Sequence, residues 1–141
     1  MNIIILLGSN LGDRLANLQQ AITSIASFST ILQQSNIYQT AAWGNTDQAD
    51  FLNQAIEIQT QQTAENLMHA LLAIESQMGR VRLQKWEPRI IDLDIIFYGT
   101  FIVMIQISLV LLKRTGTCRR REMLFWVATV MMTMRKMLFL K

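Results

Sequence analysis

The first 99 residues alternate short apolar runs with two amphipathic segments, and this order restricts the fold more than any other feature of the chain. Apolar residues recur every three or four positions over 13–28 and over 63–78, which predicts two helices. Four further runs are apolar or alternate between apolar and polar residues, which predicts strands at residues 2–7, 31–38, 51–58 and 90–98. Polar and glycine-containing stretches separate these segments and predict the turns.

The predicted order is β-α-β-β-α-β. We therefore expect an α+β, ferredoxin-like fold, in which two helices cover one face of a mostly antiparallel four-stranded sheet. A chain of 141 residues is long enough to bury a core as one domain. The one cysteine, Cys118, excludes an internal disulfide and a multi-cysteine metal site. The apolar run at residues 2–7 is too short for a signal sequence, so we interpret it as a buried strand.

Two aspartates in the last predicted strand form the strongest chemical signal. Asp92 and Asp94 are two residues apart, so their side chains lie on the same face of a strand, and a cation would relieve their repulsion. Carboxylate oxygens that share a metal with phosphates suit Mg²⁺. Basic residues that could bind phosphate precede the pair, namely Arg80, Arg82, Lys85 and Arg89. The alternative is a solvated edge strand whose aspartates form ion pairs with Arg80 and Arg89.

Five short motifs, in this order, resemble those of the 6-hydroxymethyl-7,8-dihydropterin pyrophosphokinases of folate synthesis. The resemblance extends over about residues 1–99. The motifs are Gly8-Ser9-Asn10-Leu11-Gly12-Asp13-Arg14, Ser35-x-x-Tyr38-x-Thr40, Phe51-Leu52-Asn53, Glu75-x-x-x-Gly79-Arg80-x-Arg82, and Trp86 followed by Pro88-Arg89-x-x-Asp92-Leu93-Asp94.

The resemblance implies transfer of the β,γ-diphosphate of ATP to the hydroxymethyl group of the pterin, with release of AMP. It implies that Asp92 and Asp94 hold two Mg²⁺ ions. The catalytic residues would be Arg80, Arg82, Arg89, Asp92 and Asp94. The residues that contact ATP would be Glu75, Arg82, Trp86 and Arg89. The pterin would lie against Thr40, Ala41, Trp43, Phe51 and Asn53.

Some of these residues have simpler interpretations. Phe51 and Trp86 could be packing aromatics, Asn53 an ordinary strand residue, and Trp43 replaces the aliphatic residue that the family pattern leads us to expect. We interpret His69, in the second predicted helix, as structural. The resemblance implies a monomeric, cytoplasmic enzyme whose partners are small molecules, with no nucleic acid and no membrane span.

The composition changes abruptly near residue 100. Residues 1–100 carry five basic and nine acidic side chains, a net charge of −4, whereas residues 101–141 carry eight and one, a net charge of +7. We therefore divide the chain into a pyrophosphokinase-like domain, 1–99, and a divergent tail, 100–141. The tail contains no histidine and no proline, although the family pattern continues with a Pro-His segment and an aromatic residue that completes the pterin site.

We interpret the tail as the product of a shift in reading frame, which the nucleotide sequence of the gene would test. We expect no membrane span, because the apolar runs of the tail, such as residues 101–112, are too short. A basic membrane-surface anchor and a nucleic-acid-binding tail remain alternatives. The missing family residues predict that turnover is impaired, or that the chain is an inactive relic.

Overall fold

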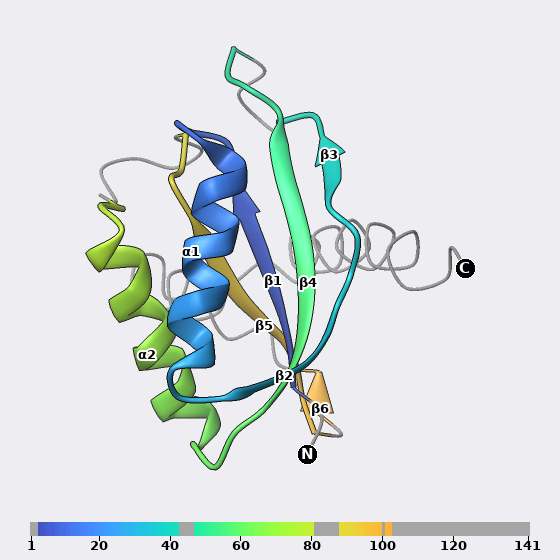
Figure 1. The fold of residues 1–141 in the computed structure, drawn as a ribbon, viewed down its shortest axis with the longest axis vertical. Coiled ribbons are helices and arrows are strands. Elements are labelled where there is room, and N and C mark those ends of the chain that lie inside the picture. Colours follow the sequence, from blue (N-terminus) through green and yellow to red (C-terminus); the bar gives the residue numbers. More distant parts are fainter. Residues whose placement is uncertain (1–2, 43–46, 81–87, 100, 103–141) are drawn as a thin grey trace, which may run out of the picture.

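An antiparallel sheet with two helices on one side makes up the part of the chain that the structure, a computed structural model, describes (Figure 1). The described residues are 3–42, 47–80, 88–99 and 101–102. The elements are β1 (Ile3–Ser9), α1 (Arg14–Ala26), β2 (Thr30–Gln34), β3 (Tyr38–Thr40), β4 (Phe51–Gln59), α2 (Ala64–Gln77), β5 (Asp92–Tyr98) and β6 (Phe101–Ile102).

The first strand of the chain lies in the middle of the sheet. The strand order is β2-β4-β1-β5-β6, and β3 also pairs with β4. Every pairing within the described residues is antiparallel. The predicted α+β class and the antiparallel sheet are therefore confirmed. The short strand β6 continues the sheet beyond residue 99, where the prediction had ended.

Both helices pack on the same face of the sheet. Ile3, Ile5 and Leu7 alternate along β1 and are buried in a core cluster with the apolar faces of α1 and α2. Each helix begins at a polar cap: the Asp13 side chain accepts a hydrogen bond from Ala16 N at 3.0 Å, and the Thr63 hydroxyl accepts one from Asn66 N at 3.3 Å.

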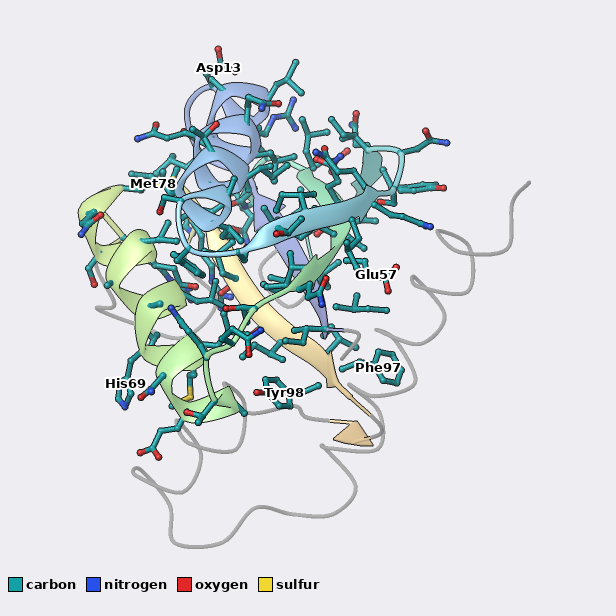
Figure 2. The ribbon with its side chains drawn as sticks, turned by 60° about the horizontal axis from the view of Figure 1, so that its bottom comes forward. Asp13, Glu57, His69, Met78, Phe97 and Tyr98 are labelled. Atoms are coloured by element: carbon teal, nitrogen blue, oxygen red, sulfur yellow. The ribbon has the colours of Figure 1, made fainter. Side chains whose placement is uncertain are left out.

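The opposite face of the sheet carries a different set of side chains. Tyr98 and Phe97, neighbours on β5, lie on opposite sides of the strand (Figure 2). Tyr98 packs against the helix-side core, and its hydroxyl donates to Gln62 O at 2.7 Å. Phe97 packs instead with the small cluster around Ile96 on the face away from the helices. We call this second surface the open face.

One continuous strand was predicted at residues 31–38, but the structure has two, β2 and β3. The prediction of a single strand is therefore wrong. Ser35 interrupts the ladder because its hydroxyl accepts the hydrogen bond from Ala55 N, at 3.0 Å, that a backbone carbonyl would accept in a regular strand. Its own carbonyl accepts a hydrogen bond from the Gln54 side chain at 2.9 Å. Side chains thus replace main-chain partners at Ser35, and the strand ends.

The predicted apolar face of α1 is too long by one turn. Leu15, which the periodicity places on that face, is 56% exposed, and the buried positions of α1 begin only at Leu18. Leu18, Ala21, Ile22 and Ile25 form the stripe that contacts the sheet.

Candidate active site

Three neighbouring strands place two predicted site residues, Asn53 and Asp92, in one row with Gly8 on the open face. Gly8 on β1 pairs with Asn53 on β4 and, on its other side, with Asp92 on β5. Cross-strand partners point to the same face of a sheet. The next residue along each of β1 and β5, Leu7 and Leu93, points into the helix-side core, so the row faces the other way. The amide of Asn53 and the carboxylate of Asp92 therefore flank a glycine.

Gly8 is buried between these two polar groups, and a side chain at this position would meet its neighbours. A Cβ atom at Gly8 would lie 3.1 Å from Asn53 Oδ1 and 3.6 Å from Phe51 Cδ1. The contact with Asn53 Oδ1 is tight, so the Asn53 amide would have to shift by a few tenths of an ångström, whereas the distance to Phe51 is an ordinary van der Waals contact. Glycine therefore avoids a tight contact with Asn53 at this position.

The residues predicted to contact the pterin gather on the Asn53 side of the row. Asn53 Nδ2 donates to Thr40 Oγ1 at 2.8 Å, and Thr40 pairs with Phe51 across β3 and β4. Ala41 follows Thr40 and is exposed. Trp43 lies outside the described residues. Thr40, Phe51 and Asn53 are thus brought together, as a shared binding role requires.

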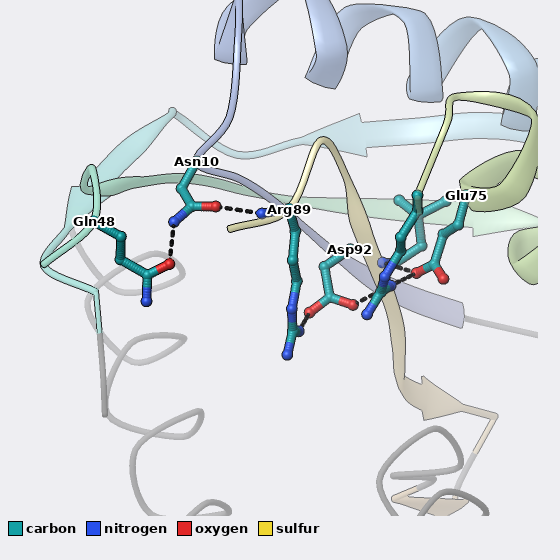
Figure 3. Close-up of polar contacts among 7 residues, drawn as sticks. Asn10, Gln48, Glu75, Arg89 and Asp92 are labelled. Atoms are coloured by element: carbon teal, nitrogen blue, oxygen red, sulfur yellow. Dashed lines mark hydrogen bonds and ion pairs between the residues drawn. The ribbon is translucent and has the colours of Figure 1, made fainter. Parts of the chain in front are cut away.

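The residues predicted to act on phosphate gather at Asp92, on the other side of Gly8. Arg80 Nη1 forms an ion pair with Asp92 Oδ1 at 2.5 Å, and Arg89 forms a second ion pair with Asp92 Oδ2 (Figure 3). The ion-paired arrangement that the sequence left as an alternative is therefore present at Asp92. Arg82 and Trp86 lie outside the described residues.

Glu75 anchors this cluster to α2. Its side chain is buried, with 1% of the residue exposed, and it forms an ion pair with Arg80. Glu75 Oε1 also accepts a hydrogen bond from Leu93 N at 2.8 Å. One carboxylate thus holds both an arginine of the cluster and the backbone of β5, and its predicted contact with ATP stays a prediction.

Burial and neighbouring charges shift the pKa values of two residues in this cluster. Burial and the nearby carboxylate of Asp92 raise the pKa of Asp94 to about 8. Burial alone would lower the pKa of Arg80, but the charges of Asp92 and Glu75 outweigh it and raise that pKa. Arginine in this position stays charged, whereas Asp94 bears a negative charge at neutral pH only at an energetic cost.

The donor set fits Mg²⁺ that is shared with phosphates. The described residues contain no group of three or more histidine, cysteine or acidic side chains suited to hold a metal ion by themselves. Asp92 and Asp94 supply carboxylate oxygens on one face of β5, and Mg²⁺ usually completes its six ligands with water and phosphate oxygens. A cation at Asp94 would also lower the cost of charging that group.

The sequence did not reveal what Asn10 does, although Asn10 lies in one of the motifs. It is 3% exposed and bonds to segments on both sides of the site. A polar residue directly after an apolar strand was the available signal, but its partners are 38 or more residues away in sequence. The position of Gly8 between Asn53 and Asp92 was missed for a similar reason, since it depends on the register of three strands.

An antiparallel α+β sheet thus brings an amide, two carboxylates and two arginines together on one face. The chain belongs to the 7,8-dihydro-6-hydroxymethylpterin-pyrophosphokinase (HPPK) family, whose model matches residues 4–130. This match continues past residue 99, where the sequence analysis expected the resemblance to end.

Curated relatives give the same family. The chain is 44% identical over 94 residues to the 2-amino-4-hydroxy-6-hydroxymethyldihydropteridine pyrophosphokinase of Methylorubrum extorquens, covering 65% of this chain and 60% of the relative. It is 42% identical over 97 residues to the protein of the same name from Bacillus subtilis, covering 67% and 58%. It is 42% identical over 102 residues to the mitochondrial folate synthesis bifunctional protein of Pisum sativum, covering 72% and 20%.

The chain thus spans about 60% of the length of the two bacterial relatives. In the part that the structure describes, neither helix has the length and apolar character needed to cross a membrane.

Proposed function

We propose that this protein transfers pyrophosphate from ATP to 6-hydroxymethyl-7,8-dihydropterin, giving the pterin diphosphate and AMP. The observation that carries the proposal is the row of Asn53, Gly8 and Asp92, in which an amide lies across Gly8 from a cluster of carboxylates and arginines. Family membership supports it, since the relatives are named for this reaction.

On the pterin side, the amide of Asn53 is oriented by its hydrogen bond to Thr40 and would bond to the polar edge of the ring. Phe51 would stack on the face of the ring. Ala41 and Trp43 would complete this side.

On the phosphate side, Arg80 and Arg89 would bind phosphate oxygens and stabilise the charge that develops as AMP leaves. Arg82, Trp86 and Glu75 would complete the ATP site. Asp92 and Asp94 would hold two Mg²⁺ ions, which when bound neutralise the phosphate charge. The hydroxyl oxygen of the pterin attacks the β-phosphorus of ATP, and the bond from that phosphorus to the oxygen retained by AMP breaks.

The proposal is tested by measuring AMP formed from ATP, Mg²⁺ and the pterin substrate. Asp94→Ala should abolish AMP release. Glu57→Gln is the matched control, because Glu57 pairs with Ile4 on the same face of the sheet but lies two rows from Asn53. It should behave as the wild type. AMP release that persists in Asp94→Ala would contradict the assigned role of Asp94.

A second candidate is a family member with weak or no turnover. The observation that favours it is the sequence of residues 101–141, which contains no histidine and no proline where the family pattern has a Pro-His segment. Folded wild-type protein that binds both substrates but releases no AMP would support this candidate over the first. We further propose that the protein acts as a cytoplasmic monomer on small molecules alone; light scattering of the purified protein tests the monomer.

A further inference from the structure

Asn10 is a buried amide in the turn between β1 and α1, and it bonds to two segments that are distant in sequence. Its Nδ2 donates to Gln48 Oε1 at 2.9 Å and to Ala49 O at 3.1 Å. Its Oδ1 accepts from Arg89 N at 2.6 Å. Its backbone N–H donates to Arg89 O at 3.0 Å. Figure 3 shows the side chain between Gln48 and Arg89.

The chemistry of these partners fixes the orientation of the amide. A backbone N–H only donates and a backbone carbonyl only accepts, so Oδ1 must face Arg89 N and Nδ2 must face Ala49 O. Both amide hydrogens and one oxygen lone pair are used in a side chain that is 3% exposed. Aspartate has the same shape, but it would place an oxygen against Ala49 O. Only an amide satisfies both sides.

The two segments lead into the two halves of the candidate site. Residues 47–50 enter β4, which carries Phe51 and Asn53, and Arg89 precedes Asp92 of β5. A second bond ties the same turn to the first segment, because Arg14 Nη1 donates to Asp50 O at 2.8 Å. The turn after β1 therefore holds the segments before β4 and β5 at a set separation.

We propose that Asn10 is a positioning residue that sets the pterin side of the site relative to the phosphate side. This inference rests on the proposed function and adds to it a residue that touches neither substrate. Each half has its own internal contacts, such as the Asn53–Thr40 hydrogen bond and the Asp92–Arg80 ion pair. Loss of Asn10 should therefore leave the binding of each substrate alone nearly intact, while the reacting atoms lose their alignment.

The test is Asn10→Asp, compared with the wild type in steady-state kinetics and in calorimetric titrations. We expect kcat to fall by about 10- to 100-fold, the usual cost of misplacing reacting groups, while the KM for each substrate changes little. The calorimetric readout is the ratio of the pterin Kd without and with a non-hydrolysable ATP analogue and Mg²⁺. We expect this ratio to move toward one in Asn10→Asp.

Asn17→Ala is the matched control, because Asn17 is an amide at the start of α1 that bonds only locally. Its Nδ2 donates to Ser9 Oγ at 3.2 Å and to Leu11 O at 2.8 Å. Its loss should lower stability and leave kcat and the Kd ratio unchanged. If Asn10→Asp does not fold, Gln48→Ala replaces it, since it removes one of the same bonds; we then expect a smaller fall in kcat.

The outcomes separate the two proposals. A folded Asn10→Asp with wild-type kcat and a wild-type Kd ratio would overturn the inference and leave the proposed function standing. If Gln48→Ala has to replace that variant, a wild-type kcat in Gln48→Ala would do the same. A wild type that binds neither ligand would refute the proposed function and the inference with it. If the wild type binds both ligands without releasing AMP, the Kd ratio alone tests the inference. A ratio that moves toward one in Asn10→Asp supports the inference, and an unchanged ratio overturns it.

Discussion

Replacing Gly8 by alanine would add one methyl group between the two halves of the site. That carbon would lie 3.1 Å from Asn53 Oδ1 and 3.6 Å from Phe51 Cδ1. Asn53 cannot retreat freely, because its Nδ2 donates to Thr40 Oγ1 at 2.8 Å. We expect pterin binding to weaken by about 1–3 kcal/mol, the usual cost of an extra methyl group in a packed site.

This range corresponds to an increase of about 5- to 150-fold in the Kd for the pterin. Calorimetric titration with the pterin, in the presence of Mg²⁺ and a non-hydrolysable ATP analogue, measures it directly. Gly12→Ala is the control that separates an effect on the site from an effect of backbone strain. Gly12 has φ +66° and no atom within 4 Å of an added Cβ, so alanine there should lower the free energy of unfolding by about 1–2 kcal/mol and leave pterin affinity unchanged. A folded Gly8→Ala protein with wild-type affinity would refute the inference that the packing of Gly8 against Asn53 matters for pterin binding.

Two further predictions concern the acidic residues. Glu75→Gln keeps an oxygen that can accept from Leu93 N but removes the charge that pairs with Arg80. The free energy of unfolding, measured in urea, should therefore fall by about 3 kcal/mol. A urea unfolding midpoint equal to that of the wild type would contradict this. In the absence of Mg²⁺, the contribution of Asp94 to stability should decline as pH rises from 3.8 to about 8. In that range the Asp94 carboxyl retains its proton in the folded protein, because its pKa is raised there, whereas in the unfolded chain it has lost the proton. Asp94→Asn should flatten this decline in urea unfolding measured across pH, and identical profiles for the two proteins would argue against it.

The sequence was sufficient for the elements that depend on local pattern. The apolar periodicity predicted both helices and the strands at the centre of the sheet, because a buried face imposes a regular spacing on its residues. It failed at Ser35, where a hydroxyl replaces a backbone acceptor and ends a strand. It also failed at Leu15, since periodicity indicates which face a residue occupies but not how far the neighbouring layer extends.

The candidate site was predictable as a set of residues and not as an arrangement. Motif resemblance supplied Asn53 and Asp92, but their juxtaposition across Gly8 follows from strand register. The hydrogen bonds of the Asn10 side chain join residues up to 79 positions apart in sequence, so no local sequence pattern predicts them. The ion pairs of Asp92 were foreseen as an alternative to metal binding, and the structure places them beside the carboxyl group of Asp94, whose pKa is raised chiefly by burial.

The central position of β1 has a consequence for how the protein is made. β1 is synthesised before both of its partners: Ile3 pairs with Ile58 of β4 and with Tyr98 of β5. One edge of β1 stays unmatched until β4 has been translated, and the other until Tyr98, 95 residues after Ile3, has followed, about 5–20 s at the rates usual for translation. The centre of the sheet therefore joins segments that are far apart in sequence, and such non-local contacts are slow to form.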